Sequence, residues 1–265
     1  MLVHPQFSPA AFSIGDFAVH WYGLMYLIGF AGGLGLGVLR ARRPGSGWRA
    51  QQVWDMTAYI IAGVIIGGRL GYCLFYNFAW YVSHPLEIFF VWQGGMSFHG
   101  GLLGVAAGVW LFARISKRSA IAVADFLAPL VPVGLFAGRI GNFINQELWG
   151  RPTDLPWGMV FPAVDRVARH ASQLYEAALE GLVLFILLWV YSARRRAAGK
   201  VFGLFLTAYG VLRFAVEFAR EPDAHLQFIA FHWLTMGQLL SVPMAAAGLY
   251  FFFFHARRFA GRAKS

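Results

Sequence analysis

The chain has 265 residues, of which 58% are hydrophobic and only 13% are charged, with a mean hydropathy of +0.57. A soluble domain carries about 25% charged residues, so this composition excludes an ordinary water-soluble protein and indicates a membrane protein. The net charge of +10 does not indicate nucleic-acid binding, because the basic residues cluster at the ends of apolar segments. A single cysteine, Cys73, excludes an internal disulfide and a metal site built from several cysteines.

Seven segments are long and apolar enough to cross a hydrocarbon core of about 30 Å as helices. They run approximately over residues 18–39, 53–76, 98–115, 121–143, 174–193, 201–219 and 237–254. The connection 144–173, which holds several prolines, glycines and charged residues, is expected to form a small ordered cap. Residues 85–92 are too few to span and predict a re-entrant or interfacial element. We therefore predict an all-α membrane protein whose residues 1–265 form a single transmembrane domain of seven helices.

The basic residues orient this chain. Fifteen of the 22 lysines and arginines fall in four regions that alternate with regions poor in basic residues. These are Arg40, Arg42, Arg43 and Arg49; Arg114, Lys117 and Arg118; Arg194, Arg195, Arg196 and Lys200; and Arg257, Arg258, Arg262 and Lys264. Because cytoplasmic loops carry an excess of Lys and Arg, we expect the N-terminus outside and the C-terminus in the cytoplasm.

With this orientation, the ionisable residues well inside the spans gather in the outer half of the bilayer. They are Arg69, Arg139, Glu176, Glu180, Arg213 and Glu217. A charge near hydrocarbon costs about 2.5–3.5 kcal/mol on insertion scales, so such a cluster indicates function. An ion pathway needs polar groups through the whole thickness, and the one-sided distribution instead favours a site that opens to the outer leaflet.

Some of these charges also have a structural explanation. Arg213 and Glu217 lie four residues apart on one helical face, so they either neutralise each other or act directly. Glu176 and Glu180 have the same spacing, and their like charges need a cation or a proton between them. We expect Arg69 to be that structural partner.

His99 differs from the other histidines in its surroundings. The pairs Gly94-Gly95 and Gly100-Gly101 flank it and give the backbone freedom beside an imidazole that can titrate near neutral pH. His99 is therefore a candidate functional residue at the outer start of its span.

The segment 137–151 ends a long apolar run but carries two arginines, a glutamate, two asparagines and a glutamine. The guanidinium of arginine is a planar fork of donors that is well shaped to hold a phosphate. A polar site cut into the edge of a membrane protein, with an anionic phospholipid as a candidate ligand, is the prediction for this segment.

Five motifs, spread in order over most of the chain, resemble those of bacterial prolipoprotein diacylglyceryl transferases. They are HWYGLMY at 20–26, SFHGG at 97–101, GRIGNFINQELWGR at 138–151, YGVLRFAVEFAREPD at 209–223 and MGQLLS at 236–241. The family usually has Gly where Gln146 stands here, which leaves the role of that position open.

The resemblance implies a seven-span enzyme of the bacterial inner membrane whose active site faces the periplasm. It implies transfer of the diacylglyceryl group of phosphatidylglycerol to the lipobox cysteine thiol of a preprolipoprotein, with release of glycerol phosphate. The expected partners are phosphatidylglycerol, the signal peptide of the preprolipoprotein and the surrounding membrane lipids. Because the thiol arrives with the substrate and arginines can compensate charge, we expect no metal and no cofactor.

Residue roles follow at the positions that match the motifs. Arg139 and Arg213 are expected to clamp the phosphate, and His99 is the candidate base. Substrate binding is assigned to Arg139, Arg213, Tyr22, Asn142, Glu147 and Gly150. The supporting residues within the motifs are Glu217, which would orient Arg213, together with Asn145 and Arg220. Arg69, which lies outside the motifs, is a further supporting residue as the expected partner of the two glutamates. Whether His99 or an arginine-polarised group removes the thiol proton stays open.

Three functions from other classes fit less well. A retinal-type pump needs a lysine in the last span, but Lys117, Lys200 and Lys264 lie in inner regions or in the tail. A secondary transporter is the alternative when the residues alone are considered. Such a protein is expected to have internal repeats and broken midplane helices, and the sequence shows neither clearly. An intramembrane serine protease could use Ser97 with a histidine, but a GxSG motif is missing.

Overall fold

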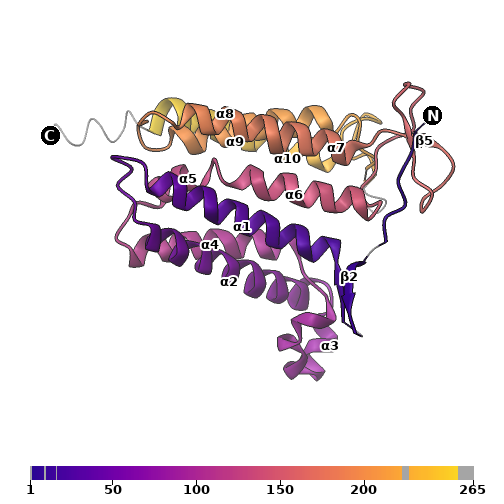
Figure 1. The fold of residues 1–265 in the computed structure, drawn as a ribbon, viewed down its shortest axis with the longest axis horizontal. Helices are drawn as coiled ribbons and strands as arrows, with labels where there is room; N and C mark the ends of the chain where they lie inside the picture. The colour runs from indigo at the N-terminus through magenta and orange to yellow at the C-terminus, as the bar shows by residue number, and fades with distance from the viewer. Residues whose placement is uncertain (1, 9, 16, 223–226, 256–265) are drawn as a thin grey trace. The chain divides into compact units, whose positions relative to one another are not determined.

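A computed structural model of the chain describes residues 2–8, 10–15, 17–222 and 227–255, most of which are helical (Figure 1). The contacts divide the chain into two compact units. One consists of Met1–Gly33 and Asp125–Ser265, and the other consists of Leu34–Ala124. The last of the four basic clusters, Arg257, Arg258, Arg262 and Lys264, lies outside the described residues.

Two long helices form the core of the second unit. They are α2 (Ala50–Phe75) and α4 (Phe98–Ile115), and the short helices between them are α3 (Phe78–Ser83), η1 (Pro85–Phe89) and η2 (Val91–Gln93). The helices α2 and α4 approach through glycines, and a Cβ added at Gly63, Gly67 or Gly104 would collide with backbone atoms of the opposite helix. Glycines recur at every fourth residue along both helices and form ridges that let the two backbones pack closely.

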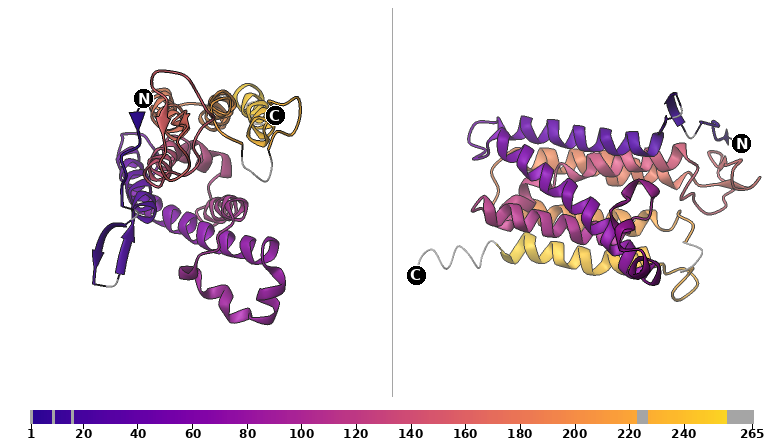
Figure 2. Two further views of the ribbon diagram at one scale, coloured as in Figure 1. Left: turned by 90° about the vertical axis from the view of Figure 1, so that its right-hand side faces the viewer. Right: turned by 90° about the horizontal axis from the view of Figure 1, so that it is seen from below.

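The first unit contains the remaining helices. They are the start of α1 (Trp21–Ala41), the end of α5 (Ala120–Leu127), α6 (Val131–Ile144), α7 (Ser172–Glu176), the π-helical η3 (Ala177–Val183), α8 (Leu184–Tyr191), α9 (Lys200–Val216), α10 (Met236–Tyr250) and η4 (Phe251–His255). The segments α7, η3 and α8 continue one another as a single span. A two-stranded hairpin, β2 (Ala10–Ile14) with β3 (Phe17–His20), precedes α1 (Figure 2). Helix α1 therefore begins at Trp21, because residues 18–20 of the predicted first span belong to β3.

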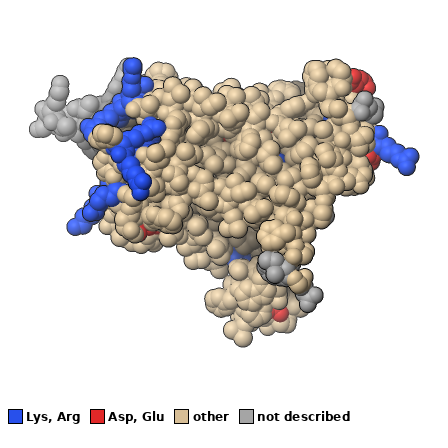
Figure 3. Space-filling model, viewed as in Figure 1, with Lys and Arg blue, Asp and Glu red and all other residues tan. Residues whose placement is uncertain are grey.

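Among the described residues, five helices are long and apolar enough to cross a membrane. They are Trp21–Ala41, Ala50–Phe75, Phe98–Ile115, Ser172–Tyr191 and Met236–Phe254. A sixth candidate is the pair α5 and α6, which is bent by 49°. Helix α9 has 17 residues and is not among these candidates. On the face shown in Figure 3, few charged side chains lie along the flanks of the helices, as expected of surfaces in contact with lipid.

Residues 144–173 form an ordered cap with a small sheet. Strand β4 (Met159–Val160) pairs in parallel with β1 (Leu2–Val3) and antiparallel with β5 (Ala168–Arg169). The side chain of His4 fastens the N-terminal segment to this region, because its Nε2 donates a hydrogen bond of 2.8 Å to the carbonyl oxygen of Phe143. The N-terminal segment thus links the sheet of the cap to the end of α6.

Candidate active site

Arg139 on α6 and Arg213 on α9 meet at one carboxylate. Arg139 Nη2 lies 2.6 Å from Glu176 Oε2, and Arg213 Nη1 donates to the same oxygen at 3.0 Å. The other oxygen of Glu176 accepts a hydrogen bond of 3.4 Å from Arg220 Nη1. The structure therefore brings together three arginines that the sequence analysis assigned to the site, around a glutamate that it did not.

Two further carboxylates complete this network. Glu180 lies 3.4 Å from Arg213 Nη1 and 3.9 Å from Arg139 Nη2, so its contacts are longer than those of Glu176. Glu217 Oε2 lies 2.6 Å from Arg213 Nη2, and this ion pair agrees with the four-residue spacing of the two side chains. Three guanidinium groups are thereby balanced by three carboxylates.

The arginines are more accessible than the glutamates that hold them. The side chains of Arg139 and Arg213 are 17% and 13% exposed, whereas those of Glu176 and Glu180 are 0% exposed. Arg139 Nε and Nη1 make no hydrogen bond within the described part of the chain. The carboxylates thus lie behind the guanidinium groups, which keep donors available for an anion.

The two glutamates lie at the π-helical segment η3, which packs against α6. A π-helix inserts an extra residue into a helical turn and is frequently found at functional sites. Glu180 lies inside η3 and Glu176 immediately precedes it. Gly181 allows the close approach of α6, because a Cβ at this position would lie 2.7 Å from the Cβ of Phe136.

Helix α10 holds Glu217 from the other side. The hydroxyl of Thr235, which caps the N-terminus of α10, donates a hydrogen bond of 3.0 Å to Glu217 Oε1. Gly237 leaves space for the carboxylate, since a Cβ there would lie 2.7 Å from Glu217 Cδ. These contacts give the MGQLLS motif a structural role in fixing the partner of Arg213.

The polar signature folds into a tight turn after α6. Asn142 Nδ2 and Asn145 Nδ2 donate hydrogen bonds of 3.3 and 3.4 Å to the two carboxylate oxygens of Glu147. Gln146 and Leu148 adopt left-handed backbone conformations, with φ of 56° and 57°. A glycine at position 146 would adopt this conformation without strain, whereas a residue with a Cβ is strained there.

Two buried side chains fasten this turn to the start of α7. Gln173 Nε2 donates to the carbonyl oxygen of Glu147 at 2.7 Å, and Ser172 Oγ donates to that of Leu148 at 3.0 Å. Sequence analysis missed both residues. The sequence feature that could have identified them is that two polar residues stand at the start of an apolar span, shortly before Glu176.

The remaining predicted residues of the first unit have separate positions. Tyr22 is 40% exposed and its hydroxyl lies 3.1 Å from that of Tyr26, while its ring lies beside Gly141 of α6. Gly150 lies where three backbone segments meet, and its N–H donates to the carbonyl oxygen of His170 at 2.9 Å. A Cβ at Gly150 would lie 2.5 Å from two carbonyl oxygens, so this glycine is required by packing.

His99 and Arg69 belong to the second unit. His99 is an exposed residue in the first turn of α4, which begins after the N-cap Ser97. Arg69 is buried and donates hydrogen bonds to backbone carbonyl oxygens of the loop before α4, including that of Ile88 at 2.9 Å. It also contacts Glu87, Gly94 and Gly95 through their carbonyl oxygens. The segment that leads to His99 is thus anchored on α2.

The predicted pairing of Arg69 with the two glutamates was wrong. Arg139, Arg213 and Arg220 bind Glu176 instead, and Arg69 caps carbonyl groups within its own unit. The spacing of residues along one helix shows which of its side chains share a face. The side chain of another helix that pairs with them depends on how the helices pack, which the spacing does not show.

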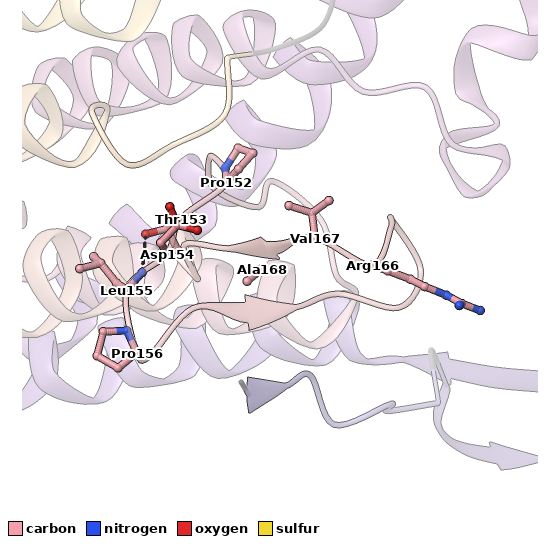
Figure 4. A pocket seen from close by; sticks show the side chains of 8 residues that line it. All are labelled: Pro152, Thr153, Asp154, Leu155, Pro156, Arg166, Val167 and Ala168. Atoms are coloured by element: carbon pink, nitrogen blue, oxygen red, sulfur yellow. Dashed lines mark hydrogen bonds between the residues drawn. The ribbon is translucent and has the colours of Figure 1, made fainter.

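The cap contains a pocket of about 480 Å³ (Figure 4). It is lined by Pro152, Thr153, Asp154, Leu155, Pro156, Arg166, Val167 and Ala168. Figure 4 shows the side chain of Arg166 extending away from the others. None of the predicted site residues lines this pocket, so the arginine network is the candidate active site.

The chemistry available at the network is anion binding by cations held in place. The described residues contain no group of three or more His, Cys, Asp or Glu side chains placed to hold a metal ion. Guanidinium groups that share a buried carboxylate and keep open donors are suited to a phosphate group. They can also stabilise negative charge that develops on a leaving oxygen.

The chain is similar to known proteins over most of its length. Residues 9–254 match the family model of prolipoprotein diacylglyceryl transferase. The phosphatidylglycerol–prolipoprotein diacylglyceryl transferase of Solidesulfovibrio magneticus is 58% identical over 252 residues, which cover 94% of this chain and 95% of the relative. The enzyme of that name from Cupriavidus pinatubonensis is 58% identical over 253 residues, which cover 94% of this chain and 91% of the relative. The chain therefore belongs to the prolipoprotein diacylglyceryl transferase family.

Proposed function

We propose that this protein transfers the diacylglyceryl group of phosphatidylglycerol to the lipobox cysteine of a prolipoprotein, in the first step of lipoprotein maturation. The cysteine sulfur attacks the glyceryl carbon next to the phosphate and forms a thioether. The bond between that carbon and the phosphate oxygen breaks, and glycerol phosphate leaves. The observation that carries the proposal is the shared, buried carboxylate that holds two partly exposed arginines from different helices.

Arg139 and Arg213 act as the phosphate clamp in this reaction. The diester carries one negative charge, and the released monoester carries about two at neutral pH, so charge develops on the leaving group as the bond breaks. Donors that are already in place stabilise this charge without a rearrangement of the site. Asn142, Glu147 and Tyr22 lie at the same end of the first unit and position the substrates.

The decisive test is transfer of labelled diacylglycerol from phosphatidylglycerol to a lipobox peptide by the purified protein. Arg139→Lys should lose at least about 100-fold in turnover, because a point charge does not reproduce the planar fork of donors. Arg196→Ala is the matched control, since Arg196 lies against Tyr191 away from the network. Normal turnover of the Lys variant would reject the clamp.

His99 is proposed as the base that removes the thiol proton. General-base assistance contributes about 10²–10⁴-fold, so His99→Gln should lower kcat by this amount while KM for phosphatidylglycerol changes little. The loss should shrink as the pH rises toward about 8.5, where a thiol ionises unaided. An equal loss at every pH would assign His99 to a structural role.

The proposed arrangement in the membrane has seven spans, with α9 as one of them and α5–α6 as another. The N-terminus and the cap over 144–173 lie on the periplasmic side of the inner membrane, and the C-terminus lies in the cytoplasm. The basic clusters support this orientation. A C-terminal reporter that is active only in the periplasm would contradict it.

A further inference from the structure

Glu176 occupies the centre of the arginine network although the proposed reaction assigns it no step. One of its oxygens contacts Arg139 at 2.6 Å and Arg213 at 3.0 Å, and the other contacts Arg220 at 3.4 Å. Its side chain is 0% exposed, so water does not compete for these contacts. No other described carboxylate has contacts this short with both clamp arginines.

The carboxylate that Arg139 and Arg213 share on Glu176 solves a physical problem of a clamp built from two arginines. Two guanidinium groups from different helices repel each other, and long side chains on separate helices have no intrinsic spacing. An oxygen shared at 2.6 and 3.0 Å sets the separation of the two groups before any substrate binds. A displacement of about 1 Å can cost about 100-fold in rate, so this spacing matters for turnover.

The charge of Glu176 has a second consequence. The network holds three guanidinium groups and three carboxylates, so it is neutral when all six are ionised. Removing one carboxylate leaves an excess positive charge, which strengthens the binding of every anion at the arginines. The released glycerol phosphate carries more negative charge than the bound diester, so its binding would be strengthened most.

We infer that Glu176 is a positioning residue that sets the spacing of Arg139 and Arg213 and limits their affinity for the phosphate product. This inference rests on the proposed function and adds a role for a residue outside the clamp itself. Glu180 contributes charge to the same arginines, but its contacts of 3.4 and 3.9 Å do not fix their spacing.

Two substitutions separate the two roles of Glu176. Glu176→Asp keeps the charge but withdraws the carboxylate by one methylene group, so kcat should fall at least tenfold while inhibition by glycerol 1-phosphate changes less than threefold. Glu176→Gln removes the charge and places an amide against the arginines. Its kcat should fall at least tenfold, and the inhibition constant of glycerol 1-phosphate should decrease at least threefold without an increase in KM for phosphatidylglycerol.

Two further variants serve as comparisons. Glu180→Gln should tighten product inhibition, as Glu176→Gln does, but should lower kcat by a smaller factor. Asp165→Asn breaks an ion pair of 2.7 Å with Arg169 in the cap and controls for the loss of an ion pair outside the arginine network. Each variant is first checked for folding by thermal unfolding in detergent. If Glu176→Gln does not fold, Glu176→Asp tests the spacing role and product inhibition of Glu180→Gln tests the effect of removing a carboxylate charge.

The outcomes distinguish this inference from the proposed function. If folded Glu176→Asp retains kcat within threefold of the wild type, the spacing role is refuted. If folded Glu176→Gln shows unchanged product inhibition, the affinity role is refuted. In both cases the clamp still stands provided that Arg139→Lys and Arg213→Lys lose transfer, whereas normal transfer by those two variants rejects the clamp itself.

Discussion

Gln146 lies in the polar signature with a backbone that suits glycine. Its φ of 56° is in the left-handed region, which costs a residue with a Cβ about 1–2 kcal/mol. In return, its side-chain Oε1 accepts a hydrogen bond of 3.1 Å from the backbone N–H of Ala163 in the cap. Such a bond contributes about 0.5–1.5 kcal/mol net. In this chain, the hydrogen bond between the signature turn and the cap therefore offsets much of the backbone strain at Gln146.

Substitution by Ala and by Gly separates these two terms. Gln146→Ala keeps the strained backbone and removes the hydrogen bond, so it should lower the free energy of unfolding by about 1 kcal/mol. Gln146→Gly also removes the bond but relieves about 1–2 kcal/mol of strain, offset by about 0.5–1 kcal/mol of extra chain entropy. The Gly variant should therefore be close to the wild type and about 1 kcal/mol more stable than the Ala variant.

Thermal unfolding in detergent measures this difference. For a chain of this size, 1 kcal/mol corresponds to about 2–4 °C in Tm, so Gln146→Gly should unfold about 2–4 °C above Gln146→Ala. Leu148 provides the matched control, because its φ is 57° and its side chain donates and accepts no hydrogen bond. Leu148→Gly should likewise unfold above Leu148→Ala. An Ala variant as stable as the Gly variant at both positions would refute the assignment of strain to this turn.

Three other substitutions test contacts that position the site. Asp125→Ala should lower the free energy of unfolding by about 2–4 kcal/mol in thermal unfolding, because its carboxylate accepts two hydrogen bonds of 2.7 Å from backbone N–H groups at the start of α9. Gly150→Ala should abolish transfer and reduce the yield of folded protein in size-exclusion chromatography, since the new Cβ would lie 2.5 Å from two carbonyl oxygens. Burial lowers the pKa of His4 below its usual 6.5, although its hydrogen bond with Phe143 opposes this shift. His4 therefore stabilises the fold fully above about pH 6.5 and loses this contribution as the pH falls through its folded pKa, so the decrease in Tm on acidification should be smaller in His4→Gln.

Apolar length and composition predicted the membrane helices, but not their interruptions. The predicted span 121–143 is a pair of helices bent by 49°. Two prolines, Pro129 and Pro132, lie at the bend, and Pro132 occupies the first turn of α6, where its missing N–H costs nothing. The prolines were visible in the sequence, whereas the angle depends on how each half packs. The hairpin before α1 was not predicted, and Ala18, Val19 and His20 of β3 were assigned to the first span instead.

Charge spacing predicted contacts within one helix better than contacts between helices. The four-residue spacing of Arg213 and Glu217 predicted a contact that is present at 2.6 Å. The same spacing in Glu176 and Glu180 indicated a need for a cation or a proton, but the expected cation, Arg69, was the wrong one. The partners come from α6, from α9 and, in the case of Arg220, from the segment after α9. No pattern in the sequence indicated the π-helical segment that contains Glu180.

The neutral network explains how a phosphate site can be built among helices that cross a membrane. Unpaired arginines would each cost about 2.5–3.5 kcal/mol on insertion scales, and the buried carboxylates offset this cost. Because these carboxylates bind Arg139 through Nη2, its Nε and Nη1 keep their donors for a ligand. In the proposed reaction, the phosphate enters a site whose cations are already spaced and paired. Stabilisation of the leaving group therefore requires no new charge in the membrane, only hydrogen bonds from donors that are already oriented.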